Sequence, residues 1–391
     1  MAKPQLPIYM DNHATTRTDP RVVDAMLPYF SEHFGNAASR MHVFGQYAEQ
    51  IVKTARQQIA GCIGAEPREL IFTSGATESN NLAIKGVAHQ LADRGKHLVT
   101  LTTEHRSVLD TCAHLESDGW RVTRVPVQPD GLVELSQLKA ALQPDTVLVS
   151  IMLANNEIGI IQPIRELCSI CHERGILFHT DATQAVGKIP VNVRELEIDL
   201  LSFTAHKLYG PKGVGALFIR RQGSRVRLEP LIDGGGHEQG LRSGTLAVPL
   251  IVGFAEACRL AASEMPMESV RLLQLRERLW QGLQSKIQHI RLNGAWEPRL
   301  PGNLNISLDW VKGESLLLEL KDIALSSGSA CTSMDSEPSH VLRALGLDEE
   351  QADASLRFGL GRFNTSDEVD YAIERVAEVV ARLRQLSSAA S

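Results

Sequence analysis

The 391 residues exceed the needs of one small hydrophobic core and suffice for a large domain together with a smaller one. With 43% hydrophobic and 22% charged residues, the composition excludes an intrinsically disordered chain. The 40 Lys and Arg residues against 46 Asp and Glu residues give a formal charge of −6. A general nucleic-acid binder is expected to be basic, so we do not expect a nucleic-acid partner.

The sequence also argues against a membrane span or a targeting signal. The longest apolar run, Val147 to Ala154, is strand-sized and interrupted by Ser150, whereas a helix that crosses a bilayer needs roughly 20 residues. The first residues, MAKPQLPIYMDNH, contain no hydrophobic signal region. The six cysteines are scattered, which is typical of reduced thiols. We therefore expect a cytoplasmic protein that does not bind a membrane.

Cys168 and Cys171 form a C-x-x-C pair, a pattern that zinc and redox sites use. No second pair follows, and the spacing also places both thiols on one face of the helix expected at 165–174. We favour the helix face and expect no resident metal.

Strand-like and helix-like segments alternate from residue 70 to about residue 218. The expected strands are 71–73, 97–102, 121–127, 146–153, 176–181, 200–204 and 215–219, because these segments are rich in apolar and β-branched residues. Helical patterns lie between most of them, at 77–94, 107–118, 135–142 and 164–174. The alternation predicts an α/β fold with a mainly parallel sheet that helices cover on both faces.

The pattern changes after Gly244. A helical stretch from about Val248 through Gln288, with a break near 265–267, precedes short strands at 303–308, 323–326 and 356–360. Helical patterns at 314–321, 339–345 and 366–386 lie between and after these strands. We predict a large domain over 15–260 and a smaller α+β domain made of 1–14 and 261–391.

Polar residues follow four of the expected strands, at the sheet edge where α/β proteins bind ligands. After the strand that ends at Thr73, the chain turns through Ser74 and Gly75 into a helix that begins near Thr77. Free N–H groups at such a helix start can hold a phosphate. The alternative is an ordinary Thr cap.

The other three strand ends carry titratable side chains. Asp181 either pairs with a protonated ring nitrogen or caps the next helix. Lys207 follows the strand 200–204 and precedes a glycine loop, where a desolvated amine can form a Schiff base, with Lys212 as a competitor in a more solvated turn. His105 is either structural or a proton carrier. Together these groups suit pyridoxal 5'-phosphate, because a carboxylate about 4 Å from the ring nitrogen contributes roughly 4 kcal/mol.

Short motifs that occur in order along nearly the whole chain carry a resemblance to a known family. They are DNHATT (11–16), TSGATESNN (73–81), TEHRSVLDTC (103–112), NNEIG (155–159), DATQAVGK (181–188), HKLYGPKGVGA (206–216), GGGHEQGLRSGT (234–245), SSGSACTS (326–333), VLRALG (341–346) and LRFGLGRF (356–363). The sequence resembles the cysteine desulfurases of the NifS/IscS family, which are class V, fold-type I pyridoxal-phosphate enzymes. The resemblance implies a mainly parallel seven-stranded sheet in a large cofactor-binding domain, and a smaller domain that carries the catalytic-cysteine loop.

The resemblance also implies a role for each residue that binds the cofactor. Lys207 would be the Schiff-base lysine, and Asp181 would pair with the pyridinium nitrogen. The residues that would flank the ring or hold the phosphate are Asn156, Gln184, Ala76, Thr77, Thr204 and His206. Thr245 would reach the phosphate of the neighbouring subunit, which implies a homodimer. The family often has Ser-Gly-His-Lys where this chain has Thr204-Ala-His-Lys, but the hydroxyl is retained.

The implied reaction converts L-cysteine to L-alanine. His105 would stack on the ring and move protons, while Arg357, with Asn156, would bind the substrate carboxylate. Cys331 would take the sulfur as a persulfide and donate it to an iron–sulfur scaffold or another acceptor. Transient iron–sulfur ligation through Cys331 and an indirect role in tRNA thiolation are compatible with this reading. The alternatives are a selenocysteine lyase, another class V pyridoxal-phosphate enzyme, or a persulfide-bearing assembly partner with weak turnover.

Overall fold

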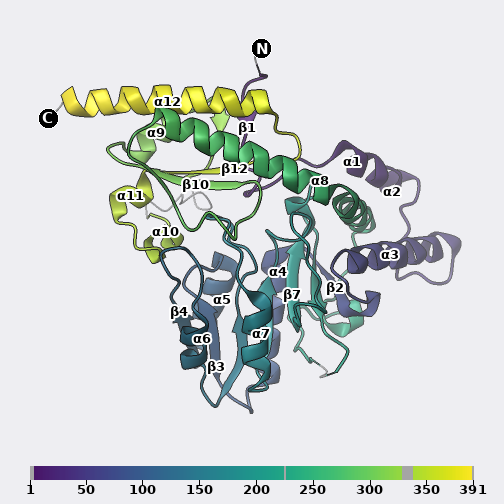
Figure 1. The fold of residues 1–391 in the computed structure, drawn as a ribbon. Helices are drawn as coiled ribbons and strands as arrows, with labels where there is room; N and C mark the ends of the chain where they lie inside the picture. The colour runs from purple at the N-terminus through teal and green to yellow at the C-terminus, as the bar shows by residue number, and fades with distance from the viewer. Residues whose placement is uncertain (1–3, 224–225, 328–337, 390–391) are drawn as a thin grey trace.

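The computed structural model describes residues 4–223, 226–327 and 338–389, and its centre is a seven-stranded sheet (Figure 1). In spatial order the strands are β2 (Leu70–Thr73), β8 (Gly215–Ile219), β7 (Leu200–Thr204), β6 (Leu177–Asp181), β5 (Thr146–Ser150), β3 (His97–Leu101) and β4 (Arg121–Val125). Strand β8 pairs antiparallel with both of its neighbours, and all other pairs are parallel. The predicted α/β fold with a mainly parallel seven-stranded sheet is confirmed.

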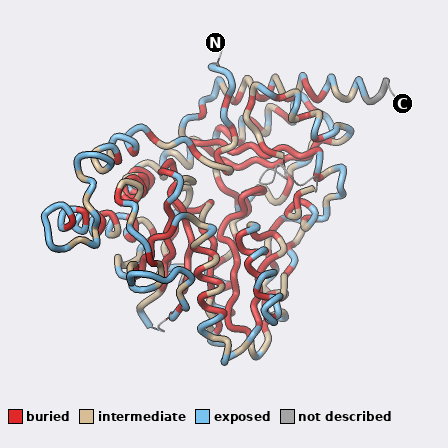
Figure 2. Tube along the Cα trace, turned by 180° about the vertical axis from the view of Figure 1, so that it is seen from behind, coloured by how far each residue is buried: buried red, intermediate tan, exposed pale blue. Residues whose placement is uncertain are grey.

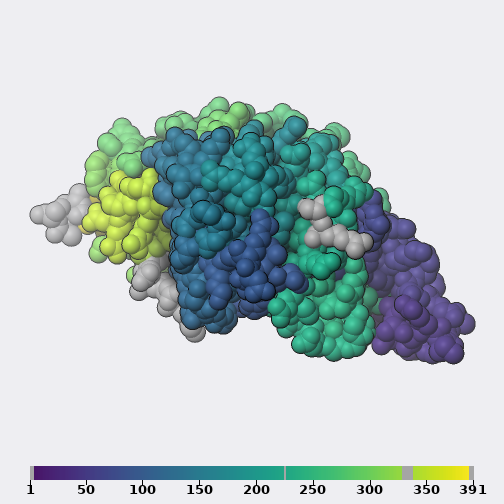
Figure 3. All heavy atoms as spheres, turned by 90° about the horizontal axis from the view of Figure 1, so that it is seen from below, coloured from purple at the N-terminus to yellow at the C-terminus, as the bar shows by residue number. Residues whose placement is uncertain are grey.

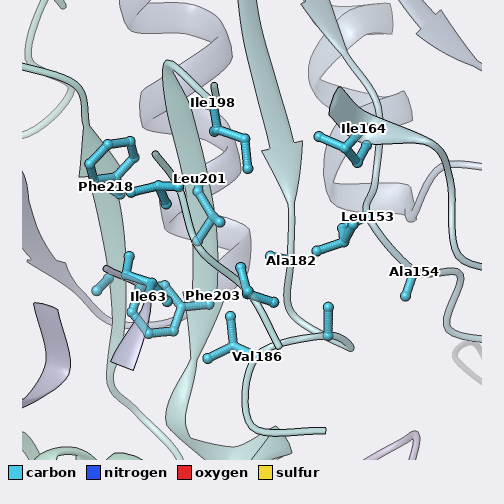
Figure 4. Close-up of a cluster of buried hydrophobic side chains, with 14 of the residues drawn as sticks. Ile63, Leu153, Ala154, Ile164, Ala182, Val186, Ile198, Leu201, Phe203 and Phe218 are labelled. Atoms are coloured by element: carbon cyan, nitrogen blue, oxygen red, sulfur yellow. The ribbon is translucent and has the colours of Figure 1, made fainter. Parts of the chain in front are cut away.

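The sheet is covered on both faces, so most of its strands are buried along their whole length (Figure 2). Successive side chains point to opposite faces: Leu200 packs with α4 (Ala76–Gln90) and α5 (Arg106–Ser117), whereas Leu201 packs on the other side. That second face is covered by α6 (Leu135–Ala141) and α7 (Ile164–His172), and Figure 4 shows Leu201, Phe203 and Phe218 packed there. Burial on both faces explains the continuous apolar runs in the sequence.

A long helix, α8 (Val248–Lys286), links the two parts of the molecule (Figure 1). The expected break near 265–267 is wrong, because the helix continues through Pro266. Proline removes one backbone donor from a helix. Here, however, Phe254 and its neighbours pack on the large core while Leu279 and Leu283 pack on the second core, so burial on both sides of Pro266 keeps the helix continuous.

The N-terminal helices α1 (Pro20–Met26), α2 (Pro28–Ser31) and α3 (Val43–Cys62) were not among the predicted elements. They form a lobe at one end of the molecule, seen in purple in Figure 3. Several large apolar side chains of this lobe are exposed: Leu27, Phe30, Phe34, Met41, Val43 and Phe44.

The second core surrounds a smaller antiparallel sheet, in the order β12 (Ser355–Gly359), β10 (Asn303–Leu308) and β9 (Ile290–Leu292). Beside it, β1 (Ile8–Tyr9) pairs in parallel with β11 (Ile323–Ala324). The helices of this region are α9 (Gly313–Glu319), α10 (His340–Ala344), α11 (Glu349–Asp353) and α12 (Ser366–Ala389). The boundary near residue 260 stays a prediction, since α8 crosses it without interruption. In the described part of the chain, none of the helices has the length and apolar character of a membrane span.

Candidate active site

A cavity of about 490 Å³ lies at the carboxyl ends of the central strands, within the size range of small-molecule sites. Sequence-predicted residues that line it are Ala76, Thr77, His105, Asn156, Asp181, Gln184, Thr204, His206 and Lys207. The structure therefore brings together residues from five separate motifs. Lys212, the competing lysine, also lines the cavity but is exposed.

One end of the cavity is built around the start of α4. Gly75 is the N-cap of this helix and has no side chain to cap the N–H groups of the first turn, which lack intrahelical acceptors. Gly215 permits this turn, because a Cβ atom there would lie 2.7 Å from the Cα atom of Gly75. His206 contacts the Thr15 hydroxyl through Nδ1 (3.0 Å), and burial together with Lys207 lowers its pKa to about 4. At neutral pH this end consequently offers neutral donors to an anion.

Asp181 lies at the end of β6, where neutral groups hold its carboxylate. Asn80 donates to Oδ2 (2.7 Å), and the Thr183 amide donates to Oδ1 (2.9 Å). Asn80 also donates to the Ser107 hydroxyl (2.8 Å), which lies 2.9 Å from Nδ1 of His105. Because the Ser107 amide donates to the same Nδ1 atom, the proton of the neutral His105 ring is on Nε2.

Sequence reasoning assigned no role to Asn80 or Ser107. Both stand inside the quoted motifs, but the contacts of Asn80 with Ser107 and Asp181 join segments that are distant in the sequence. Their contacts orient Asp181 and His105, so they belong to the site.

Lys207 follows β7 in a short 3-10 turn (Ala205–Lys207), and its Nζ atom donates to the carbonyl oxygens of His13 (2.5 Å) and Ala14 (2.6 Å). A second lysine, Lys188, was not predicted. Its Nζ atom donates to Oε1 of Gln184 (2.7 Å), and burial next to Lys207 and Arg357 lowers its pKa to about 7. The two amines thus lie near each other, and of the two only Lys207 lines the cavity.

Arg357 lies behind the cavity and does not line it. The guanidinium is buried, and it donates to Asn156 O (3.0 Å), Asp11 Oδ1 (2.8 Å) and Ser326 Oγ (3.0 Å). Asp11 and Ser326 had no predicted role, although both stand in quoted motifs. The expected contact of Arg357 with a substrate carboxylate stays a prediction.

The six cysteines differ in their surroundings, and Cys62 is partly buried, with its pKa lowered by a hydrogen bond with Cys258. Cys331 lies outside the described residues, so its predicted role is not tested. Cys112, Cys168, Cys171 and Cys258 are buried in helices, as expected for helix faces, and burial raises their pKa values, to about 12 for Cys112 and Cys171. Thiols held in this form are poor nucleophiles near neutral pH. Thr245 is exposed and does not line the cavity of its own chain.

Three buried polar atoms of residues that line the cavity have no hydrogen-bond partner in the part of the chain that the structure describes. They are His13 Nε2, Asn156 Oδ1 and Thr183 Oγ1. An unpaired buried polar atom costs about 1–3 kcal/mol. The cavity therefore suits a polar ligand that brings an anionic group to α4 and hydrogen-bonding groups to the other side.

The chain is similar to known proteins along nearly its whole length. Residues 8–372 match the family described as aminotransferase class-V. A cysteine desulfurase from Mus musculus is 56% identical over 381 residues, which cover 97% of this chain and 83% of that protein. The cysteine desulfurase IscS of Edwardsiella ictaluri is 56% identical and covers 98% of this chain and 95% of that protein. A solved NifS-like protein is 39% identical, with a TM-score of 0.90 over 97% of this chain and 100% of the other.

Proposed function

The chain belongs to the class-V aminotransferase family and is a cysteine desulfurase, and from this premise we propose that Lys207 and Cys331 carry its two chemical steps. The reaction removes sulfur from L-cysteine and leaves L-alanine. The observation that supports the proposal is the convergence of Lys207, Asp181 and the start of α4 on one cavity.

Pyridoxal 5'-phosphate is the cofactor that the lining residues fit. The N–H groups of Ala76 and Thr77, with the side chains of Thr204 and His206, would hold its phosphate. Asp181 would hold its ring nitrogen, Asn156 and Gln184 would flank the ring, and His105 would stack on it. When bound, this cofactor withdraws electrons from the Cα atom of an amino acid and so acidifies the Cα–H bond.

The residues of the chain then transfer the protons and accept the sulfur. The carbonyls of His13 and Ala14 hold the Lys207 amine, which takes the proton from Cα. Arg357 and Asn156 bind the substrate carboxylate, and Nε2–H of His105 is the available donor on the other side. The Cys331 thiolate forms a bond to the substrate sulfur as the Cβ–S bond breaks, which leaves a persulfide on Cys331 and, after protonation, alanine.

The proposed reaction also leads to two proposals about protein partners. The exposed apolar side chains of the lobe formed by α1 to α3 support a homodimer, since large exposed apolar patches mark interaction sites. In that dimer Thr245, exposed here, would contact the cofactor phosphate of the neighbouring subunit. The persulfide would pass to an iron–sulfur scaffold or another sulfur acceptor.

The direct test is to incubate the purified protein with L-cysteine and a reductant and to assay alanine and sulfide together. We expect equal amounts of both products. Formation of a keto acid, or turnover of selenocysteine with none of cysteine, would contradict the proposal.

A further inference from the structure

His13 is a buried polar residue of the cavity wall, and the proposed reaction has no role for its side chain. Only 2% of its surface is exposed, and its Nε2 atom is one of the unpaired atoms described above. Its ring packs against β12 at Gly359, where a Cβ atom would lie 3.0 Å from Cδ2 of His13 and 2.8 Å from its amide nitrogen. Glycine at this point allows the segment before Ala14 to approach the cavity.

The contacts of Gln184 determine the tautomer of His13. Nε2 of Gln184 donates to the His13 carbonyl (2.8 Å), and Oε1 accepts from Nζ of Lys188 (2.7 Å), so the amide can be placed in one orientation only. Oε1 of Gln184 also lies 3.1 Å from Nδ1 of His13, and an amide oxygen only accepts. The hydrogen of the imidazole is therefore on Nδ1, and Nε2 presents a lone pair.

The charges around His13 keep this lone pair free of a proton. Burial, with Lys188, Arg357 and Lys207 nearby, lowers the pKa of His13 well below its ordinary value. The ring is neutral at neutral pH, and Nε2 is an acceptor that lacks a donor within residues 4–223, 226–327 and 338–389. A ligand that donates a hydrogen bond to this atom removes the free-energy cost of leaving the atom unpaired.

The backbone of His13 links this acceptor to the reacting amine. Nζ of Lys207 donates to the His13 carbonyl at 2.5 Å, so the ring belongs to a residue that already holds the proposed base. L-cysteine carries donor hydrogens on its ammonium and on its thiol. A substrate that reaches Lys207 enters the same side of the cavity as His13.

We infer that Nε2 of His13 accepts a hydrogen bond from the ammonium or thiol of L-cysteine, which makes His13 a further substrate-contacting residue. The inference rests on the proposed reaction at this cavity. It assigns a function to a side chain for which neither the motifs nor the resemblance supplied one.

A pair of matched variants tests the acceptor. The His13→Asn variant keeps a donor near Gln184 at the position of Nδ1 but has no atom at the position of Nε2, whereas His13→Gln carries its amide oxygen to that position. Both are made in the holoenzyme with Cys331→Ser, so that L-cysteine binds without turnover. We expect His13→Asn to weaken L-cysteine binding about tenfold, and His13→Gln to stay within about threefold of the parent.

Binding of L-alanine shows which of the two donors makes the contact, because L-alanine has the ammonium but lacks the thiol. Weaker binding of both amino acids to His13→Asn assigns the contact to the ammonium, and weaker binding of L-cysteine alone assigns it to the thiol. Should His13→Asn fail to fold, His13→Ser takes its place with the same expectation, since its side chain does not reach the position of Nε2.

Two results would overturn the inference. One is binding of L-cysteine to His13→Asn with parental affinity. The other is loss of the cofactor from His13→Asn, measured as bound phosphate per chain at equal protein, which would make the contact one to the cofactor. Absence of alanine production by the parent enzyme would instead overturn the proposed function itself.

Discussion

The interior of the large sheet and its carboxyl edge both contain buried histidines, but the hydrogen bonding of their ring nitrogens differs between the two regions. His97 uses both ring nitrogens, which contact the hydroxyls of Thr146 (2.7 Å) and Thr123 (2.8 Å). His179 likewise contacts Ser150 (2.8 Å) and Ser202 (2.9 Å). At the carboxyl edge, His13 has one nitrogen paired and one without a partner among the described atoms. Burial therefore does not separate His13 from His97 and His179, whereas the incomplete pairing of its ring does.

The buried aspartates repeat this contrast at opposite ends of the strands. Asp199, just before β7, accepts hydrogen bonds from His172 (2.8 Å) and from the Phe178 amide (2.9 Å), and Arg220 lies 3.5 Å away. Asp181 accepts from the neutral groups of Asn80 and Thr183. The charge of Asp199 is thus balanced by the protein, and that of Asp181 is available to a cationic ligand.

The largest expected effect is that of Lys207→Ala. Without the amine, turnover should fall at least about a thousandfold, and the borohydride-reducible visible absorbance of the bound cofactor should disappear. Alanine formation and the absorption spectrum measure the two effects. Retained alanine production would move the role to Lys212.

Cys331→Ser should have a similar effect on sulfur transfer alone. A serine hydroxyl remains protonated near neutral pH, so persulfide and alanine formation should fall at least about a thousandfold, or roughly 4 kcal/mol in the barrier. Cofactor binding and cysteine-dependent spectral changes should persist, because those steps depend on the described cavity. Cys112→Ser and Cys258→Ser serve as controls and should keep parental turnover, whereas near-parental alanine from Cys331→Ser would exclude thiolate attack.

The two aspartates provide a direct test of the contrast between the sheet ends. Asp181→Asn removes a charge worth roughly 4 kcal/mol to a protonated ring nitrogen, so kcat should fall by up to about a thousandfold with little change in melting temperature. Asp199→Asn breaks a paired buried charge, so unfolding should become easier by roughly 3 kcal/mol while kcat stays within about twofold. Equal loss of kcat in both variants would contradict the contrast.

The smallest effect concerns Glu157, a buried acid beside Asn156 whose carboxylate accepts from the Ser339 hydroxyl (2.5 Å). Burial raises its pKa to about 7. Between its ordinary pKa near 4.5 and this value the native chain holds a proton that the unfolded chain has lost, so the contribution of Glu157 to stability declines as pH rises. Relative to the parent, Glu157→Gln should gain about 2 kcal/mol between pH 5 and pH 8. Melting temperatures of both proteins across this range measure the gain, and a constant difference would contradict it.

The sequence alone determined the large sheet and most of the candidate site. Apolar runs that alternate with helical patterns identify buried parallel strands, and every predicted strand of the sheet is present within a few residues. Because the carboxyl ends of such strands meet at one edge, Thr77, His105, Asp181 and Lys207, which end or follow these strands, could be assigned to one site, and all four line the cavity. These features depend on local periodicity, which a single sequence contains.

Only the tertiary structure decided the continuity of α8, the roles of Asn80 and Ser107, and the partnership of His13, Gln184 and Lys188. Pro266 predicts a break in the helix, but packing against two cores keeps the helix continuous. The local sequence pattern does not contain this packing. His13 and Gln184 are 171 residues apart in the chain, and their contact specifies which imidazole nitrogen bears the proton. Whether a buried polar atom is paired depends on donors and acceptors contributed by distant segments, so it is a property of the folded chain and not of any motif.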